Sequence, residues 1–158
     1  MVVLSVCLKG EFENIDSVSV NSQICCNTRC QCGAVRQNVW INANEEVDVP
    51  NSRGKANIVI KCTACERRST ISNLTFIKGM YKSSEGHVHI IATAECRSCT
   101  IDSFSLDDTP FSFHFEEREI EMDNDDGCFF GFDDVTGNPT SVTETSVVIE
   151  TFRERNLL

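Results

Sequence analysis

Paired cysteines constrain this 158-residue chain more than any other feature of its sequence. The chain has ten cysteines, at positions 7, 25, 26, 30, 32, 62, 65, 96, 99 and 128, and most of them lie in close pairs. The apolar opening is short, has no basic stretch before it and runs directly into Lys9 and Glu11, so we expect no secretory leader and a cytoplasmic location. In that reducing compartment, clustered cysteines bind metal or perform redox chemistry more often than they form disulfides.

The pair Cys62 and Cys65 has the spacing of a metal-binding knuckle, spanning about 61–66. It follows the β-branched stretch 57–61, which we expect to be a strand. At the end of a strand, Cys-x-x-Cys turns the chain so that both thiolates face one ion, and zinc–sulfur bonds of about 2.3 Å place neighbouring sulfurs roughly 3.8 Å apart. The pair therefore predicts half of a zinc site.

The other half must come from a second knuckle at about 25–34. Cys30-Gln31-Cys32 is followed by Gly33, which can adopt the positive φ expected after a second ligand. The spacing is Cys-x-Cys, but residues i and i+2 of an extended chain point to one side, so both thiols can share an ion; Cys26 is the reserve ligand. We predict one zinc ion held by Cys30, Cys32, Cys62 and Cys65. The alternative is that these are ordinary buried thiols.

Hydrophobic alternation with a period of two predicts strands along most of the chain. The alternating residues are Leu4, Val6 and Leu8; Val88, Ile90, Ala92 and Ala94; and Phe111, Phe113 and Phe115. The stretches 70–77 and 146–152 are also expected strands. No window shows a convincing helical stripe, although 116–122 is compatible with a short helix. We expect one all-β domain, 1–158, with two packed or strongly bent, mainly antiparallel sheets carrying the two knuckles.

The formal net charge of −10 limits the partners of this chain. An acidic surface repels phosphate groups, so we do not expect nucleic acid or an anionic membrane as a partner. A metal ion or a basic protein is a compatible partner. Seven acidic residues between 116 and 126 are expected to form a solvated, mobile loop, because the glycine falls at the wrong offset for a calcium-binding EF-hand. A basic docking partner is the alternative for this segment.

The remaining metal-ligating side chains give weaker signals. Cys96 and Cys99 form another Cys-x-x-Cys, which we expect to be two reduced thiols; a redox dithiol or a second metal half-site is the alternative. His87 and His89 share one face of a strand but lack a third ligand, so we expect solvated histidines. The sequence contains no nucleophile motif, phosphate loop or dinucleotide fingerprint, so we expect that the chain is not an enzyme.

The block Arg53–Cys65 resembles the eukaryotic family of CXXC motif containing zinc binding proteins, whose signature is an Arg-Gly-x-Ala segment, a strand and Lys-Cys-x-x-Cys. The similarity extends from about residue 3 to 105 and more loosely through 147–152. It includes Leu8–Ile15, similar to the family's opening strand; Trp40, after the first knuckle; and Ala94–Arg97, similar to a Glu-Cys-Arg-Gly element with Ser98 in place of the glycine.

The resemblance implies an all-β fold, no established catalytic activity and one zinc held by two cysteine pairs, here Cys62 with Cys65 and Cys30 with Cys32. The first pair departs from the family pattern because it is one residue shorter. We therefore expect a structural four-cysteine zinc site in a protein-interaction module. The alternative is a thiol-redox or metal-transfer protein that uses the Cys-x-Cys and Cys-x-x-Cys pairs.

Overall fold

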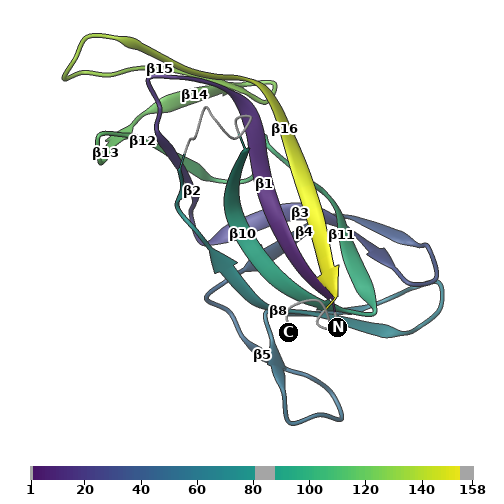
Figure 1. Cartoon of the computed structure of the whole chain (residues 1–158). Coiled ribbons are helices and arrows are strands. Elements are labelled where there is room, and N and C mark those ends of the chain that lie inside the picture. The colour runs from purple at the N-terminus through teal and green to yellow at the C-terminus, as the bar shows by residue number, and fades with distance from the viewer. Residues whose placement is uncertain (1, 81–87, 154–158) are drawn as a thin grey trace.

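The computed structural model describes residues 2–80 and 88–153. Every regular element in this part of the chain is a β-strand, and the strands form four antiparallel sheets (Figure 1). The all-β, mainly antiparallel fold is therefore confirmed. Within the same residues, no helix has the length and apolarity that crossing a bilayer requires.

The largest sheet has seven strands in the order β14-β15-β16-β1-β10-β8-β7. Its strands are β14 (Met122–Asp125), β15 (Cys128–Phe132), β16 (Pro139–Arg153), β1 (Val2–Glu13), β10 (Val88–Arg97), β8 (Arg68–Phe76) and β7 (Ile58–Lys61). In Figure 1 the long strands β1 and β16 run side by side through the middle of the molecule. This sheet therefore connects the β14–β15 end to the β7–β8 end.

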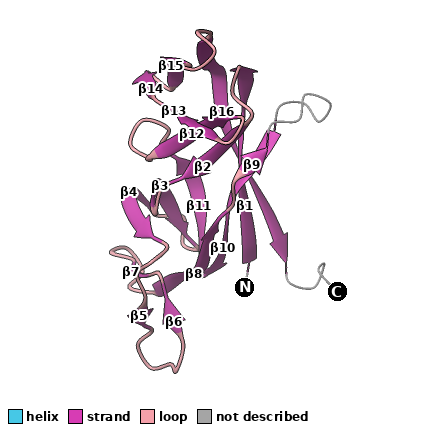
Figure 2. Ribbon diagram, turned by 90° about the vertical axis from the view of Figure 1, so that its left-hand side faces the viewer, coloured by secondary structure: helices cyan, strands magenta, loops and turns pink. Residues whose placement is uncertain are grey.

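Three smaller sheets complete the fold (Figure 2). One contains β11 (Cys99–Phe104), β3 (Gln23–Cys30) and β4 (Val35–Asn42) in that order. A second contains β13 (Arg118–Ile120), β12 (Phe111–Phe115), β2 (Ser17–Val20) and β9 (Gly79–Met80). The third pairs β5 (Val47–Asp48) with β6 (Lys55–Ala56).

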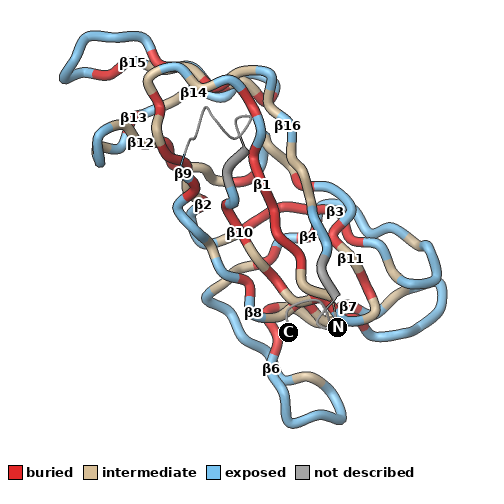
Figure 3. Tube along the Cα trace, in the orientation of Figure 1, coloured by how far each residue is buried: buried red, intermediate tan, exposed pale blue. Residues whose placement is uncertain are grey.

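Strand β1 lies at the centre of the core, as the buried colour along it in Figure 3 shows. Leu4, Val6 and Leu8 are at most 2% exposed, as their alternation predicted. Burying such a side chain stabilises the fold by about 1.5–3 kcal/mol. The intervening Ser5 and Cys7 are buried as well, so β1 is covered on both faces.

Strand β10 departs from its expected alternation at one point. Ala92 and Ala94 are buried as expected, but Ile90 is 48% exposed and Ile91 is fully buried. The ladder to β1 contains an irregularity here, since Val6 pairs with Ala92 while the next residue of β1 pairs with Ile90. An extra residue at a β-bulge exchanges the two faces of a strand. The bulge explains the wrong assignment of Ile90 to the core.

The acidic segment is ordered, and the expectation of a mobile loop was wrong. Residues 122–132 form the hairpin β14–β15, and the short helix considered over 116–122 is replaced by β13 and the start of β14. Phe129, on β15, is 4% exposed, and its ring centroid lies 4.7 Å from that of Phe113 and 5.8 Å from that of Phe111. This aromatic cluster fixes the hairpin while its carboxylates remain in solvent.

The close packing of Gly131, on β15, against the neighbouring strand β14 gives a test of the fold. A Cβ atom on Gly131 would collide with the backbone oxygen of Glu121 and approach Met122 Sδ to 2.6 Å. Overpacking of this kind costs about 1–3 kcal/mol. We expect Gly131→Ala to lower the free energy of unfolding by that amount in urea denaturation. Gly54→Ala is the control, because its Cβ would meet only Ser52 Oγ at 3.4 Å, and equal stability of the two variants would contradict the packing.

Candidate metal centre

The first knuckle is the turn of the β3–β4 hairpin. The Cys30 amide donates to the Ala34 carbonyl at 2.9 Å, and the Gly33 amide donates back to the Cys30 carbonyl at 2.9 Å. Gly33 has a φ of 96°, as predicted for the residue after a second ligand. The turn places Cys30 and Cys32 at the tip of the hairpin.

The second knuckle is the turn between β7 and β8. The Cys62 amide donates to the Arg67 carbonyl at 2.9 Å, and the Glu66 amide donates to the Cys62 carbonyl at 2.9 Å. Glu66 has a φ of 61°, so it holds the left-handed conformation that Gly33 holds in the first knuckle. The two knuckles thus have the same pattern of closing bonds.

The shortened first knuckle has a simple structural explanation. Its two closing bonds reach residues 33 and 34, three and four positions after Cys30, whereas those of Cys62 reach residues 66 and 67, four and five positions later. The first turn is one residue shorter than the second, and each of its two closing hydrogen bonds spans one residue fewer. The Cys-x-Cys spacing is therefore accommodated by a tighter hairpin turn.

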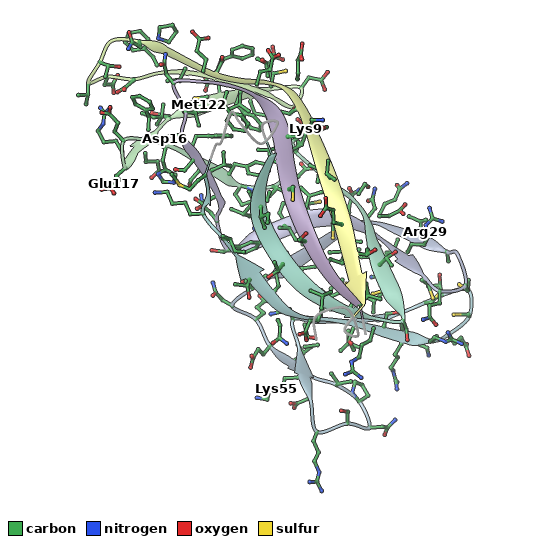
Figure 4. All side chains as sticks on the ribbon, viewed as in Figure 1. Lys9, Asp16, Arg29, Lys55, Glu117 and Met122 are labelled. Carbon is green, nitrogen blue, oxygen red and sulfur yellow. The ribbon has the colours of Figure 1, made fainter. Side chains whose placement is uncertain are left out.

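The four predicted cysteines converge at one corner of the molecule. Their sulfur atoms all lie within 4.8 Å of one another, with 3.6 Å between Cys30 and Cys65 and 3.6 Å between Cys32 and Cys62. Figure 4 shows sulfur atoms gathered beside the labelled Arg29. Four sulfurs around one zinc ion are roughly 3.8 Å apart, so the donor set fits such an ion. Cys26, the reserve ligand, is instead buried in the core.

Backbone amides prepare one of these thiols to ionise. The amides of Cys65 and Ala64 donate to the Cys62 sulfur and lower the pKa of Cys62 to about 6. At Cys32 the amide of Ala34 lowers the pKa, but the neighbouring thiols of Cys62 and Cys30 outweigh it and raise the pKa to about 11. Four thiolates this close repel one another, so full ionisation requires a cation at the centre.

Arg29 stands where a Cys-x-x-Cys knuckle would have its first cysteine, and it stabilises the turn. Its Nη1 donates to the Gly33 carbonyl at 3.1 Å, while Nε and Nη2 donate to the two carboxylate oxygens of Asp102 at 3.2 and 3.0 Å. The fork-to-carboxylate geometry fixes the guanidinium between the knuckle and β11. Sequence analysis missed this role because Asp102 is distant in the chain.

The bend between β10 and β11 connects the two knuckles. The carbonyl of Ser98 accepts the Gln31 amide at 3.2 Å and the Ser69 hydroxyl at 3.0 Å, and so contacts both hairpins. The side chains of Arg67, in the second knuckle, and Gln31, in the first, also form a hydrogen bond. Ser98 has a φ of 62°, a conformation that glycine adopts without strain. The resemblance supplied the one signal for this corner, since the family has glycine there.

The remaining thiols lie outside the cluster. Cys96 and Cys99 flank the Ser98 bend and are 1% and 6% exposed, and the Cys99 thiol donates to the Thr70 carbonyl at 3.9 Å. The hydrogen bond with the neighbouring Cys99 thiol and burial raise the pKa of Cys96, whereas the same hydrogen bond lowers the pKa of Cys99. A buried thiol with a raised pKa, such as Cys96, is a poor nucleophile for redox exchange.

The histidines do not join the cluster in the described part of the chain. His114 Nε2 lies 3.3 Å from the hydroxyl of Ser19. His87 lies outside the described residues, as does the side chain of His89.

The Ser98 bend yields a stability prediction. A β-branched side chain in the left-handed region is strained by about 1–2 kcal/mol, whereas glycine is not. We expect Ser98→Val to lower the thermal midpoint by several degrees and Ser98→Gly to preserve it, measured by calorimetry on the metal-free protein. Equal midpoints for the two variants would show that this corner does not need its positive φ.

The Cys62 thiol yields a prediction for pH. Because its pKa is lowered to about 6, Cys62 should be anionic at neutral pH in the metal-free protein, and its alkylation by iodoacetamide should be half-maximal near pH 6. Cys26, whose pKa burial raises to about 12, is the internal control and should stay unmodified. Mass spectrometry of the alkylated peptides measures both. A Cys62 titration near 9 would contradict the role of the turn amides.

Comparison with known proteins agrees with this geometry. The family model for the eukaryotic CXXC motif containing zinc binding protein matches residues 5–150. UPF0587 protein F46B6.12 of Caenorhabditis elegans is 30% identical over 129 residues, which cover 73% of this chain and 71% of that protein.

Two solved structures share the fold. The crystal structure of C1orf123 has a TM-score of 0.79 at 20% identity, over 95% of this chain and 99% of that one. A hypothetical protein from Plasmodium falciparum has a TM-score of 0.76 at 21% identity, over 95% of this chain and all of the other. The family match, the relative and the four converging cysteines lead to one conclusion: this chain belongs to the eukaryotic CXXC motif containing zinc binding protein family.

Proposed function

We propose that the chain binds one zinc ion through Cys30, Cys32, Cys62 and Cys65, and that this is a structural site within a protein-interaction module. The observation that carries the proposal is the pair of 3.6 Å sulfur–sulfur distances between the knuckles. Soft thiolate donors select zinc over the hard cations calcium and magnesium.

A structural role follows from the donor set. Four thiolates complete the usual coordination of zinc and leave no position where a water molecule could be activated. Catalytic zinc sites instead keep one position open, so the proposal includes no enzymatic activity.

The ion would connect two hairpins that belong to different sheets. The facing cysteines are 30 and 35 residues apart in the chain. By analogy with a covalent cross-link, closing a loop of that length stabilises the fold by roughly 3–4 kcal/mol through chain entropy. The free energy of metal binding would thereby contribute to folding.

Metal transfer is the second candidate, and one observation favours it. Cys32 and Cys65 are exposed, one on each knuckle, so a competing thiol ligand can reach the cluster. Transfer requires zinc to leave within minutes in the presence of an acceptor, whereas a structural ion stays until the protein unfolds. The rate at which a zinc-binding dye removes the metal from folded protein separates these two candidates.

The structural site gives a direct mutational test. Cys62→Ser should reduce zinc from one ion per chain towards zero and lower the melting temperature by about 10 °C, because the cross-link is worth roughly 3–4 kcal/mol. Plasma emission spectrometry and calorimetry measure the two quantities. Cys128→Ser is the matched control, since Cys128 is a partly exposed thiol on β15 outside the cluster.

Two results would count against the proposal. If Cys62→Ser retained zinc, the ligand set would be wrong. If the variant lost zinc but had the same melting temperature as the unsubstituted protein, the site would not be structural. Metal transfer would then be favoured.

A further inference from the structure

An open groove lies at the end of the molecule that carries β13, β14 and β15. We call it the distal groove. Its volume is about 740 Å³, and it is lined by residues of β13, β14 and β15 and of the turn that follows β15, from Asp133 to Val135. These strands and the knuckle-bearing hairpins lie at opposite ends of the molecule in Figure 1. The groove is therefore separate from the candidate metal centre.

The floor of the distal groove presents apolar side chains to solvent. Phe130 and Phe132 occupy alternate positions of β15 and are 47% and 55% exposed, while the intervening Gly131 has no side chain. Val135, in the turn after β15, is 74% exposed. A group of neighbouring exposed apolar residues, unlike single scattered ones, marks an interaction site.

The turn that presents Val135 is held rigidly. The carboxylate of Asp133 is 1% exposed and accepts hydrogen bonds from Arg118 at 3.0 and 2.9 Å, from the Val135 amide at 3.0 Å and from the Thr136 hydroxyl at 2.9 Å. Burial alone would raise the pKa of Asp133, but these bonds hold it below its ordinary value. A fixed surface loses little entropy when a ligand binds.

The charge around the apolar floor is negative. Glu119, Glu121, Asp123 and Asp134 line the groove. Among the described residues that line it, Arg118 is the one cation, and it is already paired with Asp133. This arrangement repels nucleic acid and anionic lipid and attracts a cationic ligand. A ligand that satisfies both features must combine positive charges with apolar side chains.

Two sheet edges border the groove. Among the described strands, β14 is the last strand of the seven-stranded sheet and β13 is the last strand of the four-stranded sheet. The backbone of an edge strand can pair with an added extended segment. In such a segment, alternate side chains point to one face, so its apolar side chains can lie together on the apolar floor. Asp123 pairs with Phe130 across β14 and β15, so its carboxylate lies on the same face as the floor, within reach of a long cationic side chain.

We propose that the distal groove binds an extended, cationic segment of a partner protein, with its apolar side chains on Phe130, Phe132 and Val135 and its lysine or arginine side chains against Glu119, Glu121, Asp123 and Asp134. This inference rests on the proposed interaction function and specifies its surface and the chemistry of the partner. It does not depend on which atoms bind the metal.

The test uses the zinc-loaded full chain and three fluorescein-labelled synthetic nonapeptides in anisotropy titrations. One peptide alternates lysine with leucine, one alternates lysine with serine, and one alternates glutamate with leucine. We expect the lysine–leucine peptide to bind at least about tenfold more tightly than the lysine–serine peptide, and the glutamate–leucine peptide not to bind.

Variants locate the binding site. Phe132→Ser and, as a second apolar variant at a highly exposed position, Val135→Ser should each weaken binding of the lysine–leucine peptide by about fivefold or more. The double variant Glu121→Gln/Asp123→Asn should weaken binding and reduce its dependence on salt. Trp40→Ser, at a 45% exposed aromatic residue on β4, is the matched control and should bind unchanged.

Three results would overturn the inference. The first is equal binding of the lysine–serine and lysine–leucine peptides, which would indicate non-specific charge attraction without recognition of the apolar side chains. The second is unchanged binding by both apolar variants. The third is concentration-dependent self-association that Phe132→Ser abolishes, since a second copy would then occupy the groove. Zinc content is measured in the same samples, so failure here is distinguishable from failure of the metal site.

Discussion

The approach of four cysteine sulfurs to within 4.8 Å is the constraint on which the rest of this structure depends. The β3–β4 hairpin belongs to the three-stranded sheet and β7–β8 to the seven-stranded sheet, so the two turns have no backbone ladder between them. The Ser98 carbonyl contacts both hairpins, but the sulfurs repel one another once they ionise. In the proposed site, a bound cation would convert that repulsion into attraction, and metal binding would add to the contacts that join the two sheets.

Sequence reasoning succeeded where the signal was local. Strand alternation located β1, β10 and β12, and β-branched composition located β8. Cysteine spacing with a following glycine predicted that Cys30 and Cys32 lie together with Cys62 and Cys65. It failed where distant residues decide the outcome. The bulge at Ile91 depends on the ladder to β1, the order of the acidic hairpin depends on packing of Phe129 against Phe113, and the roles of Arg29 and Ser98 depend on contacts with other strands. Composition alone indicated a mobile acidic loop because it contains no information about these contacts.

The two ends of the molecule have different chemistry. In Figure 4, Asp16 and Glu117 lie at one end, while Arg29 lies beside the gathered sulfur atoms at the other. The proposals assign metal binding to the second end and partner binding to the first. The seven-stranded sheet, with β1 buried at its centre, connects them. Under these proposals, a structural ion would preserve the binding surface without contacting the partner. The shared fold implies neither role by itself, since function depends on the particular sites.

X-ray absorption at the zinc edge, measured on the purified full chain, tests the central claim most directly. The account predicts one zinc per chain with four sulfur neighbours at about 2.3 Å and no nitrogen or oxygen in the first coordination sphere. A spectrum with fewer than four sulfurs, or with a water or histidine ligand, would contradict the closed four-cysteine site. It would also remove the basis for assigning the ion a structural role.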